Sequence, residues 1–344
     1  MSKFLVNGKF LAQRTTGVQR VARELLNALD QISSEGDFLL VAPANAIDIP
    51  KFQNIKVLQT NTPASIFFDQ IKIPLLSVKM KIPALHLCHT GPFLKPDYVM
   101  IHDANVEKNP QWFTKRIVVW YKLIHWVCAK RAKKIFTVSD FSKNELAAVY
   151  KIPQSKIVNI GNGWQHVEKN KANECAAAKY NLENKNFFFS LGTKAPHKNL
   201  KWIYEYATKH PSETFAISGS SYGRIFGKID MFIPSNVRFL GYLNDSDVRS
   251  LMQDCKAFLF PSFYEGFGIP PLEALSAGCP VVVSDIPVMR EIFGESVHYI
   301  DPNNTEIDLN TILKKTVATA IPVLEKYSWE KSAVKLRECL LLQD

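Results

Sequence analysis

Long apolar runs are missing from this chain of 344 residues. The longest ones, such as KAFLFPSF and PVVVSD, have the length of a strand and are too short to cross a membrane. The opening stretch MSKFLVNGKF lacks the apolar region that a signal peptide needs. We therefore expect a cytoplasmic protein without a transmembrane helix.

Paired cysteines are also missing. Six cysteines are scattered without any CxxC spacing: Cys88, Cys128, Cys175, Cys255, Cys279 and Cys339. In a cytoplasmic protein they are expected to be free thiols, several of them in the core. The histidines show no metal-ligand spacing with Cys or Asp, so we predict neither a bound metal nor another cofactor.

Acidic residues are absent between Glu107 and Asp140, in a chain whose net charge is +10. Eight basic residues lie in that gap, with aromatic residues between them: Lys108, Lys115, Arg116, Lys122, Lys130, Arg131, Lys133 and Lys134, and Trp112, Phe113, Trp120, Tyr121 and Trp126. Such a surface attracts anionic membranes. The alternative is a solvated helix whose apolar stripe is core, since Ile117, Trp120, Tyr121, Ile124 and Cys128 keep helical spacing. No recognition motif supports nucleic acid as a partner.

What is present is a regular alternation of strands and helices. The expected strands are 3–8, 37–43, 97–103, 133–140, 156–163, 187–192, 213–219, 237–243, 257–262, 280–285 and 298–301. Helices are expected between them, including 139–150 with Ser142 as N-cap and 244–255 capped by Asn244 or Asp245. The polar stretch 164–186 is the expected linker. This pattern predicts an α/β protein with two Rossmann-like domains, whose parallel sheets face each other across a cleft and bind ligands at the carboxyl ends of strands.

Two glycine turns follow expected strands. The loop around Gly17 lets backbone approach a phosphate beside a helix start, although without a full GxGxxG spacing it is equally a simple tight turn. In SLGTKAPHKNL, Lys198 lies beside a helix start, where an ammonium suits a pyrophosphate. Lys194 and His197 are nearby alternatives, and an ordinary surface lysine is the competing interpretation.

The stretch PSFYEGFGIPPLEALSAGCPVVVSD, residues 261–285, places two acids around a glycine turn. Gly266 and Gly268 allow the loop backbone to press against a ligand, and the prolines that follow preset a helix. Glu265 and Glu273 are able to accept hydrogen bonds from sugar hydroxyls, or one of them to act as a base or nucleophile. For Glu273, compensation of the helix dipole is the alternative.

One histidine ends an expected strand. His102 in VMIHD is expected to face the cleft. The alternative is a core histidine whose hydrogen-bonding groups are satisfied within the protein.

Six ordered blocks resemble the family 4 retaining glycosyltransferases. They are TTGVQRVARELL, VMIHD, the segment from AKRAKKIFTVSD to NIGNG, SLGTKAPHKNL, VRFLGYLNDSDVRSLMQDCKAFLFPS with the two-glutamate stretch, and the late YSWEKSAVKL. The resemblance implies a GT-B fold: an acceptor domain over 1–165, a donor domain over 166–327, and a helix over 328–344 that returns to the first domain. It also implies a nucleotide-sugar donor.

The resemblance implies roles for individual residues. Lys198 would bind the donor diphosphate, Glu265 would lie near the transferred sugar, and Glu273 would take the ribose hydroxyls. His102 would reach the sugar, making Glu265, His102 and Lys198 the catalytic set. The remaining implied donor contacts are Gly17, Gly192, Thr193, Lys194, His197, Gly241, Tyr242, Gly266, Phe267, Gly268 and Ile269.

One departure from the family concerns cations. Many members carry Arg where this chain has Thr193 or His197, so Lys194 or a protonated His197 would have to replace it. We expect Lys198 to carry most of the charge.

The implied activity is transfer of a sugar with retention and without a metal, to a glycan or lipid-linked acceptor in polysaccharide or O-antigen assembly. The first loop resembles mannosyltransferases, so GDP-mannose is the first donor considered, with UDP- and dTDP-sugars open. An epimerase related by fold and a noncatalytic subunit of a glycan assembly complex are the alternatives. The basic segment fits an enzyme peripheral to the inner face of the cytoplasmic membrane.

Overall fold

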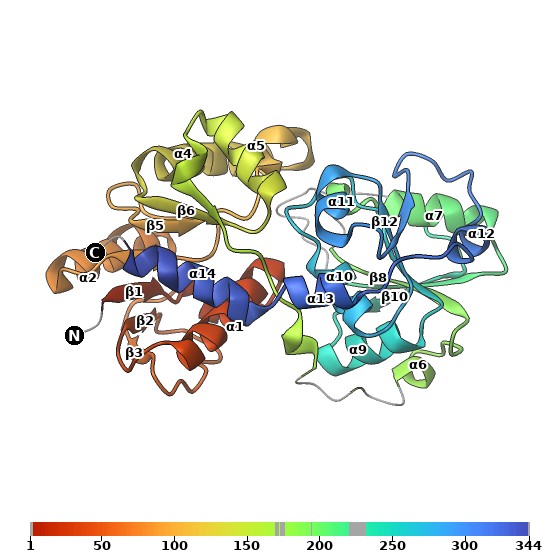
Figure 1. The fold of residues 1–344 in the computed structure, drawn as a ribbon, viewed down its shortest axis with the longest axis horizontal. Coiled ribbons are helices and arrows are strands. Elements are labelled where there is room, and N and C mark those ends of the chain that lie inside the picture. Colours follow the sequence, from red (N-terminus) through yellow and green to blue (C-terminus); the bar gives the residue numbers. More distant parts are fainter. Residues whose placement is uncertain (1–2, 169–171, 173–175, 194, 220–231, 343–344) are drawn as a thin grey trace. The chain divides into compact units, whose positions relative to one another are not determined.

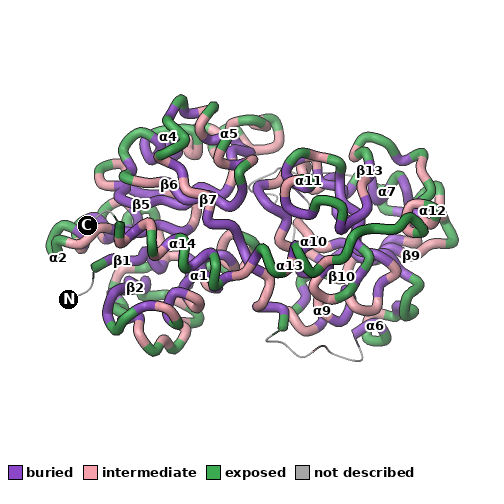
Figure 2. Tube along the Cα trace, in the orientation of Figure 1, coloured by how far each residue is buried: buried purple, intermediate pink, exposed green. Residues whose placement is uncertain are grey.

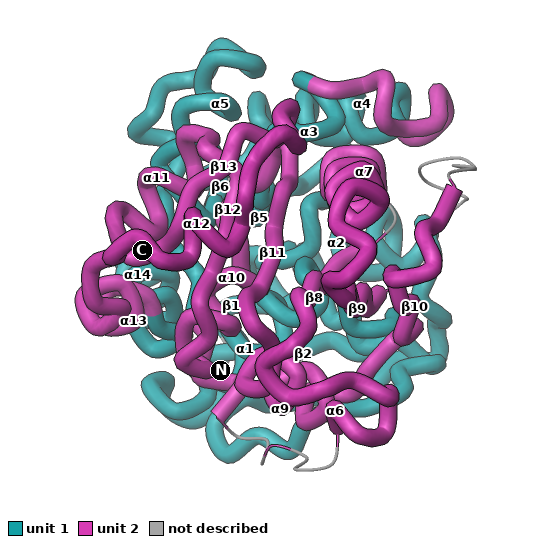
Figure 3. The backbone as a smooth tube through the Cα atoms, turned by 90° about the vertical axis from the view of Figure 1, so that its right-hand side faces the viewer, with its two compact units in different colours: residues 1–108, 118–163, 328–344 teal, residues 109–117, 164–327 magenta. Residues whose placement is uncertain are grey.

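Two compact units make up the computed structural model, which describes residues 3–168, 172, 176–193, 195–219 and 232–342. Unit 1 comprises residues 1–108, 118–163 and 328–344, and unit 2 comprises 109–117 and 164–327 (Figure 3). Each unit is built on a parallel sheet flanked by helices. Most strands are buried in the centre of their unit (Figure 2). The predicted α/β class with two parallel-sheet domains is confirmed.

The sheet of unit 1 has the strand order β3-β2-β1-β4-β5-β6-β7 in the described residues, and every pairing is parallel. Its strands are β1 (Phe4–Asn7), β2 (Phe38–Ala42), β3 (Lys56–Gln59), β4 (Ala84–His86), β5 (Tyr98–Met100), β6 (Lys134–Thr137) and β7 (Ile157–Asn159).

The helices of unit 1 cover this sheet. They are α1 (Gly17–Ile32), α2 (Ile73–Met80), α3 (Asn105–Lys108), α4 (Lys115–Arg131, from residue 118 on), α5 (Asp140–Tyr150) and α14 (Trp329–Leu341). A capping box between Thr16 and Gln19 starts α1. Its apolar face, with Leu25 and Leu29, is buried. The late helix α14 packs along α1, so the chain end returns to unit 1 as predicted (Figure 1).

The sheet of unit 2 has the order β10-β9-β8-β11-β12-β13 in the described residues, again all parallel. Its strands are β8 (Phe187–Leu191), β9 (Thr214–Ser218), β10 (Val237–Gly241), β11 (Ala257–Phe260), β12 (Val281–Ser284) and β13 (His298–Ile300).

In the described residues, the helices of unit 2 are α6 (Ala176–Lys179), α7 (Leu200–Lys209), α9 (Asp245–Asp254), α10 (Ile269–Ser276), α11 (Pro287–Phe293), α12 (Leu309–Leu313) and α13 (Ile321–Lys326). Trp202, Ile203 and Tyr206 of α7 pack on Phe188 and Phe215 of the sheet in one buried cluster. Burial of these large apolar side chains is the main force that holds the helix layer to the strands.

In both sheets, the direction in which the chain adds successive strands reverses at one place. In unit 1 the chain moves one way from β1 to β3 and the other way from β4 to β7, so the switch lies between β1 and β4. In unit 2 the corresponding switch lies between β8 and β11. At such a point the loops after two neighbouring strands diverge and leave room for a ligand.

Some local predictions were wrong. Helix α5 is capped by Ser139, whose Oγ accepts a hydrogen bond from the Ser142 backbone N–H, so Ser142 is not the cap. Ser139 has the extended backbone that an N-cap requires, whereas Ser142 already lies in the first turn. For α9 the cap is Asn244, one of the two candidates.

Several elements escaped the sequence analysis, among them β3, β4 and α2. All four residues of β3 are exposed, β4 has only three residues, and α2 carries apolar residues on its exposed side as well as its buried side. Their sequences therefore lack the one-sided apolar pattern from which an element is recognised.

The basic segment forms α4, as expected from its spacing. Ile124 and Cys128 are buried, while Ile117, Trp120 and Tyr121 are half-buried. The apolar stripe therefore belongs to the core along part of the helix. Trp126, by contrast, is exposed. None of the helices in the described part of the chain is long and apolar enough to span a bilayer.

Five of the six cysteines lie in the described residues, and all five are free, as predicted. Cys175 lies outside the described residues.

Candidate functional site

The switch point of unit 2 brings together two of the predicted residues. Lys198 follows β8, Glu265 follows β11, and these strands are neighbours. The Nζ of Lys198 lies 2.7 Å from Oε1 of Glu265, with side-chain exposures of 18% and 12%. The same Nζ lies 4.9 Å from the ring centroid of Phe260. The site therefore holds an ammonium in a shielded place, where its charge acts more strongly than at an open surface.

A short loop holds Lys198 in position. Lys198 ends the 3-10 turn Pro196–Lys198, and Asn199 follows with a left-handed φ of 53°. The side-chain amide of Asn199 donates to the carbonyl oxygens of Pro261 at 3.0 Å and Pro302 at 2.9 Å. The Phe263 N–H also donates to the His197 carbonyl oxygen at 2.8 Å. These bonds tie the β8 loop to the β11 loop and fix the distance between Lys198 and Glu265.

Glycines line the adjacent strand ends. A Cβ on Gly192 would lie 3.6 Å from Cδ of Lys198, so the lysine stem crosses directly over this glycine. A Cβ on Gly219, which has φ of 151°, would lie 1.6 Å from the Gly192 carbonyl oxygen, and no side chain fits there. Gly219 was not among the predicted residues. Its signal was available, because it ends the expected strand 213–219 beside the Gly192 loop.

Gly241 and Tyr242 follow the next strand end. Gly241 has a left-handed φ of 69°, and its carbonyl oxygen accepts from the Gly219 N–H at 2.8 Å and from the Ser218 hydroxyl at 2.9 Å. Tyr242 is exposed. The backbone here thus reaches the same end of the sheet as the Lys198 loop.

The glycine turn has the geometry that its sequence suggested. Gly268 has φ of 104° and is the N-cap of α10, which begins at Ile269 with prolines in its first turn. A Cβ on Gly268 would lie 3.0 Å from the Met289 methyl group, so space as well as backbone favours glycine. Gly266 and Phe267 are buried, and the Phe267 ring packs edge-on against Tyr327 at 5.0 Å between centroids.

Glu273 has a partner that the sequence analysis missed. Its Oε1 lies 2.6 Å from Nε2 of His166, and both side chains are almost fully buried. His166 belongs to the stretch that we interpreted as linker, which gave no periodic signal. Glu273 lies in the second turn of α10, so its carboxylate is positioned by the helix on one side and by the imidazole on the other.

His166 is itself held by the segment around it. It lies in the 3-10 turn Gln165–Val167, and the guanidinium of Arg249 donates to the Val167 carbonyl oxygen at 3.0 Å. The Trp164 indole N–H donates to the Leu324 carbonyl oxygen at 3.0 Å. The described part of the predicted linker therefore contributes to the site.

The remaining residues that were considered as ligands of the diphosphate are His197, Thr193 and Lys194. Burial, and then the nearby Lys198 charge, lower the pKa of His197 to about 3. This lowered pKa argues against a protonated His197 in place of the missing arginine, since the pKa lies well below pH 7. Thr193 is half-buried, and Lys194 lies outside the described residues.

In unit 1, Gly17 is the first residue of α1 and not part of a loop. A Cβ on Gly17 would have no atom within 4 Å, so packing of the described chain does not require glycine here. Open space beside the N–H groups of a helix start is what an approaching anion needs.

His102 follows β5 and is buried in unit 1. Its Nε2 lies 3.1 Å from the Leu87 carbonyl oxygen, so this nitrogen carries the proton and donates. Burial, and next the neighbouring His89, lower the pKa of His102 to about 3.

His102 belongs to a histidine cluster that was not predicted. His89, which has a left-handed φ of 60°, lies between the rings of His102 and His125, at centroid distances of 4.7 and 5.8 Å. Nδ1 of His125 lies 3.0 Å from Oε1 of Glu107. Since His89 follows β4, the cluster extends from the switch point of unit 1 to the end of β5.

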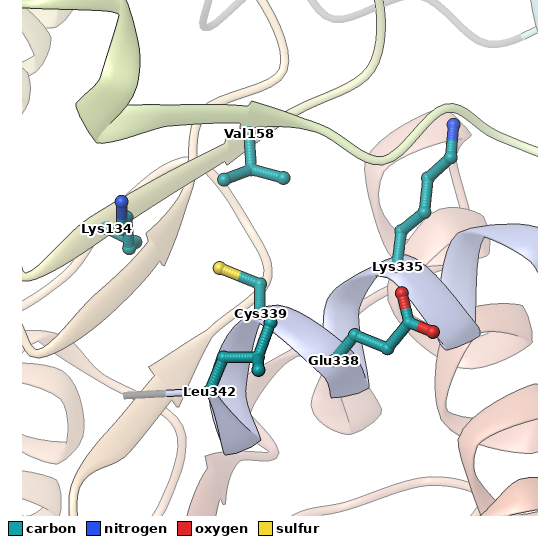
Figure 4. Close-up of a pocket in the computed structure, with 6 residues that line it drawn as sticks. All are labelled: Lys134, Val158, Lys335, Glu338, Cys339 and Leu342. Carbon is teal, nitrogen blue, oxygen red and sulfur yellow. The ribbon is translucent and has the colours of Figure 1, made fainter. Parts of the chain in front are cut away.

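A surface pocket of unit 1 lies away from all predicted site residues. It lies between α14 and strands β6 and β7 and is lined by Lys134, Val158, Lys335, Glu338, Cys339 and Leu342 (Figure 4). Within the described ranges, no three His, Cys, Asp or Glu side chains are grouped so as to hold a metal ion.

Comparison with known proteins identifies the family and the fold. Residues 37–165 match the model described as Glycosyltransferase Family 4, and residues 173–317 match Glycosyl transferases group 1. The solved structure of HepE from Anabaena, in complex with UDP and glucose, is similar over 99% of both chains with a TM-score of 0.66 and 14% identity. The fold is thus that of the GT-B glycosyltransferases.

Sequence relatives show which glycosyltransferases this chain is similar to. The chain is 30% identical to O-antigen chain mannosyltransferase B of Escherichia coli over 252 residues, which are 67% of this chain and 66% of the relative. It is 29% identical over 221 residues to O-antigen chain mannosyltransferase RfbU of Salmonella typhimurium, covering 63% of this chain and 60% of the relative. The chain belongs to the family 4 glycosyltransferases. It spans slightly less than two thirds of the length of these two relatives.

Proposed function

We propose that this protein transfers a sugar from a nucleotide-sugar donor to a glycan or lipid-linked saccharide in surface polysaccharide or O-antigen assembly. Mannose is the first candidate for the sugar. The single observation that carries the proposal is the Lys198–Glu265 pair at the switch point of unit 2. A shielded ammonium next to a carboxylate suits a ligand that joins a diphosphate to a polyhydroxyl group. The names of the two relatives support mannose and O-antigen assembly.

In the proposed reaction, the bond between the anomeric carbon and the diphosphate oxygen breaks, and its electron pair stays on that oxygen. Lys198 and the backbone N–H groups of the turn Gly266–Ile269 stabilise the developing charge. The acceptor hydroxyl attacks the anomeric carbon from the face that the diphosphate leaves, which retains configuration. Its proton passes to the leaving phosphate oxygen, and no metal takes part.

The proposed roles of the remaining residues are those that the family resemblance implies. Glu265 orients the sugar and balances the charge of Lys198, and Glu273, held by His166, accepts hydrogen bonds from the ribose hydroxyls. From unit 1, His102 contacts the donor sugar and Gly17 leaves room for the diphosphate.

GDP-mannose is the first candidate for the donor, and UDP- or dTDP-sugars are the alternatives. The test is thermal stabilisation by GDP, UDP, dTDP and ADP, each with and without magnesium. A ligand present at a hundred times its dissociation constant adds about 2.7 kcal/mol to the free energy of unfolding. We expect one of the four nucleotides to stabilise the protein clearly more than the others. This stabilisation should not depend on magnesium and should be lost in Glu273→Ala.

The same nucleotide then identifies the sugar. Consumption of GDP-mannose only when a saccharide acceptor is added supports a transferase, whereas turnover without an acceptor supports the epimerase alternative. Stabilisation by none of the four nucleotides shifts the proposal to a noncatalytic binding subunit of a glycan assembly complex.

A further inference from the structure

Helix α2 presents an apolar stripe to solvent. Phe67, Ile71, Leu75 and Val78 are all exposed and follow one another at spacings of four, four and three residues, which places them on one side of the helix. This α2 stripe begins just before the π-helical segment Phe68–Lys72, which continues into α2. The opposite side of the helix, with Phe68 and Ile73, is buried against the sheet. Packing in unit 1 therefore accounts for one side of α2 and leaves the stripe uncovered.

The neighbouring helix carries a second exposed apolar row. Val119, Leu123 and Trp126 of α4 are exposed, at spacings of four and three residues. Figure 2 shows exposed chain along both α2 and α4.

One loop, which contains Gly91 and Phe93, contacts both helical segments. The amide of Gln70 donates to the Gly91 carbonyl oxygen at 3.1 Å, and its Oε1 accepts from the Phe93 N–H at 2.9 Å. The ring of Phe93 packs edge-on against Trp120 of α4 at 5.7 Å between centroids. Leu94, next to Phe93, is exposed. The stripe, Leu94 and the α4 row thus lie on elements that contact one another through Gln70 and Phe93.

The charge around this surface has one sign. Within residues 66–100 and 118–134, Asp69 and Asp97 are the only acids, and both are buried. Asp69 is paired with Lys9, and Asp97 with Lys95. Besides Lys134, which lines the pocket at α14, the same two stretches contain eight basic residues: Lys72, Lys79, Lys81, Lys95, Lys122, Lys130, Arg131 and Lys133. An apolar row bordered by cations fits an anionic surface that has an apolar interior.

We infer that the α2 stripe, Leu94 and the exposed row of α4 form a surface that docks on an anionic lipid bilayer, with the apolar side chains inserted below the headgroups. This inference rests on the proposed function, because a lipid-linked acceptor is presented at a bilayer. It adds α2 to the basic segment that the sequence indicated. A second copy of this chain is disfavoured as the occupant, because two such surfaces would bring like charges together.

The test is flotation of the full chain with vesicles of phosphatidylcholine alone and of phosphatidylcholine mixed with phosphatidylglycerol. We expect binding to the anionic vesicles, weakened by salt and lost in the double variant Ile71→Ser with Leu75→Ser. Removal of each large apolar side chain should lower the partition coefficient about tenfold. The matched control is Ile321→Ser on α13 of unit 2, since Ile321 is 60% exposed and Leu75 is 61% exposed.

A second pair of variants tests the charge, and a native probe reports insertion. Lys79→Glu should weaken binding to anionic vesicles, whereas Lys314→Glu, the same change at an exposed site of unit 2, should not. Brominated lipids should quench the fluorescence of Trp126, and the quenching should disappear in Trp126→Phe.

Three results would overturn the inference. They are equal binding of wild type and the stripe double variant, binding that ignores lipid charge, and a wild-type dimer in light scattering that the double variant abolishes. None of these bears on nucleotide binding in unit 2, so the thermal shift with nucleoside diphosphates, repeated on the stripe variants, separates failure here from failure of the proposed transferase.

Discussion

Lys198 is the shielded cation of the candidate site, and its removal gives the most direct test at the scale of a residue. We expect Lys198→Ala to weaken binding of the preferred nucleoside diphosphate by one to two powers of ten, since a hydrogen bond to a charged group is worth about 1.5–3 kcal/mol. Calorimetric titration measures the change. Lys201→Ala, at an exposed lysine of α7, is the control. Unchanged affinity in Lys198→Ala would exclude Lys198 as the main diphosphate ligand.

The Lys198→Ala variant also leaves Glu265 without this partner, and its negative charge would then repel a diphosphate. The double variant Lys198→Ala with Glu265→Gln separates the two effects. Recovery of affinity in the double variant would mean that repulsion by Glu265 caused the loss.

His166 is expected to act through Glu273, because the two side chains meet at 2.6 Å in a buried place. We predict that His166→Ala weakens nucleotide binding and that His166→Gln, which keeps a donor, restores part of it. In a double-mutant cycle with Glu273→Gln, the two losses should not add, because residues in contact are coupled. Purely additive losses would contradict a positioning role for His166.

At the scale of elements, two glycines should respond oppositely to the same substitution. Gly17 begins α1 with free space around it, so Gly17→Ala should leave the melting temperature unchanged or higher while lowering nucleotide affinity. Gly219→Ala should lower the melting temperature strongly, because its Cβ would collide with the Gly192 carbonyl oxygen. Thermal unfolding with and without nucleotide measures both. Full nucleotide affinity in Gly17→Ala would argue for a simple helix start.

Elements were predictable where burial leaves a clear pattern in the sequence. Helix α1 has one buried side, which repeats with the period of a helix. The strands β8, β11 and β12 are buried on both faces and appear as short continuous apolar runs. Helix α2 was missed, since its uncovered apolar stripe hides the contrast between its two sides. The 3-10 turn around His166 was missed because it has too few residues for a period.

At the scale of the whole molecule, buried histidines predict how stability depends on pH. Burial is the main cause that lowers the pKa of His86 to about 4, and those of His89 and His102 to about 3. The unfolded chain takes up these protons below about pH 6.5, whereas folded unit 1 does not until the pH nears 3–4. Each such histidine thus contributes stability above pH 6.5 that is lost as the pH falls, at about 1.4 kcal/mol per pH unit.

Urea unfolding at pH 7 and pH 5, followed by tryptophan fluorescence, measures this loss. His89→Asn is the matched variant, because asparagine tolerates the left-handed φ of 60° and does not titrate. We expect a shallower fall of the unfolding free energy with pH in His89→Asn than in wild type. An equal fall in both would show that His89 is protonated in the folded unit.

The candidate residues could be chosen without a structure, since the two-glutamate turn, the Lys198 loop and the alternation of strands and helices are local patterns with local physical causes. Which of these residues meet depends on the fold. That Lys198 lies against Glu265, Glu273 against His166, and His89 between His102 and His125 depends on strand order, which brings distant residues together. The lowered pKa of His197 likewise could not be read from the sequence, because a pKa depends on burial and on neighbouring charges.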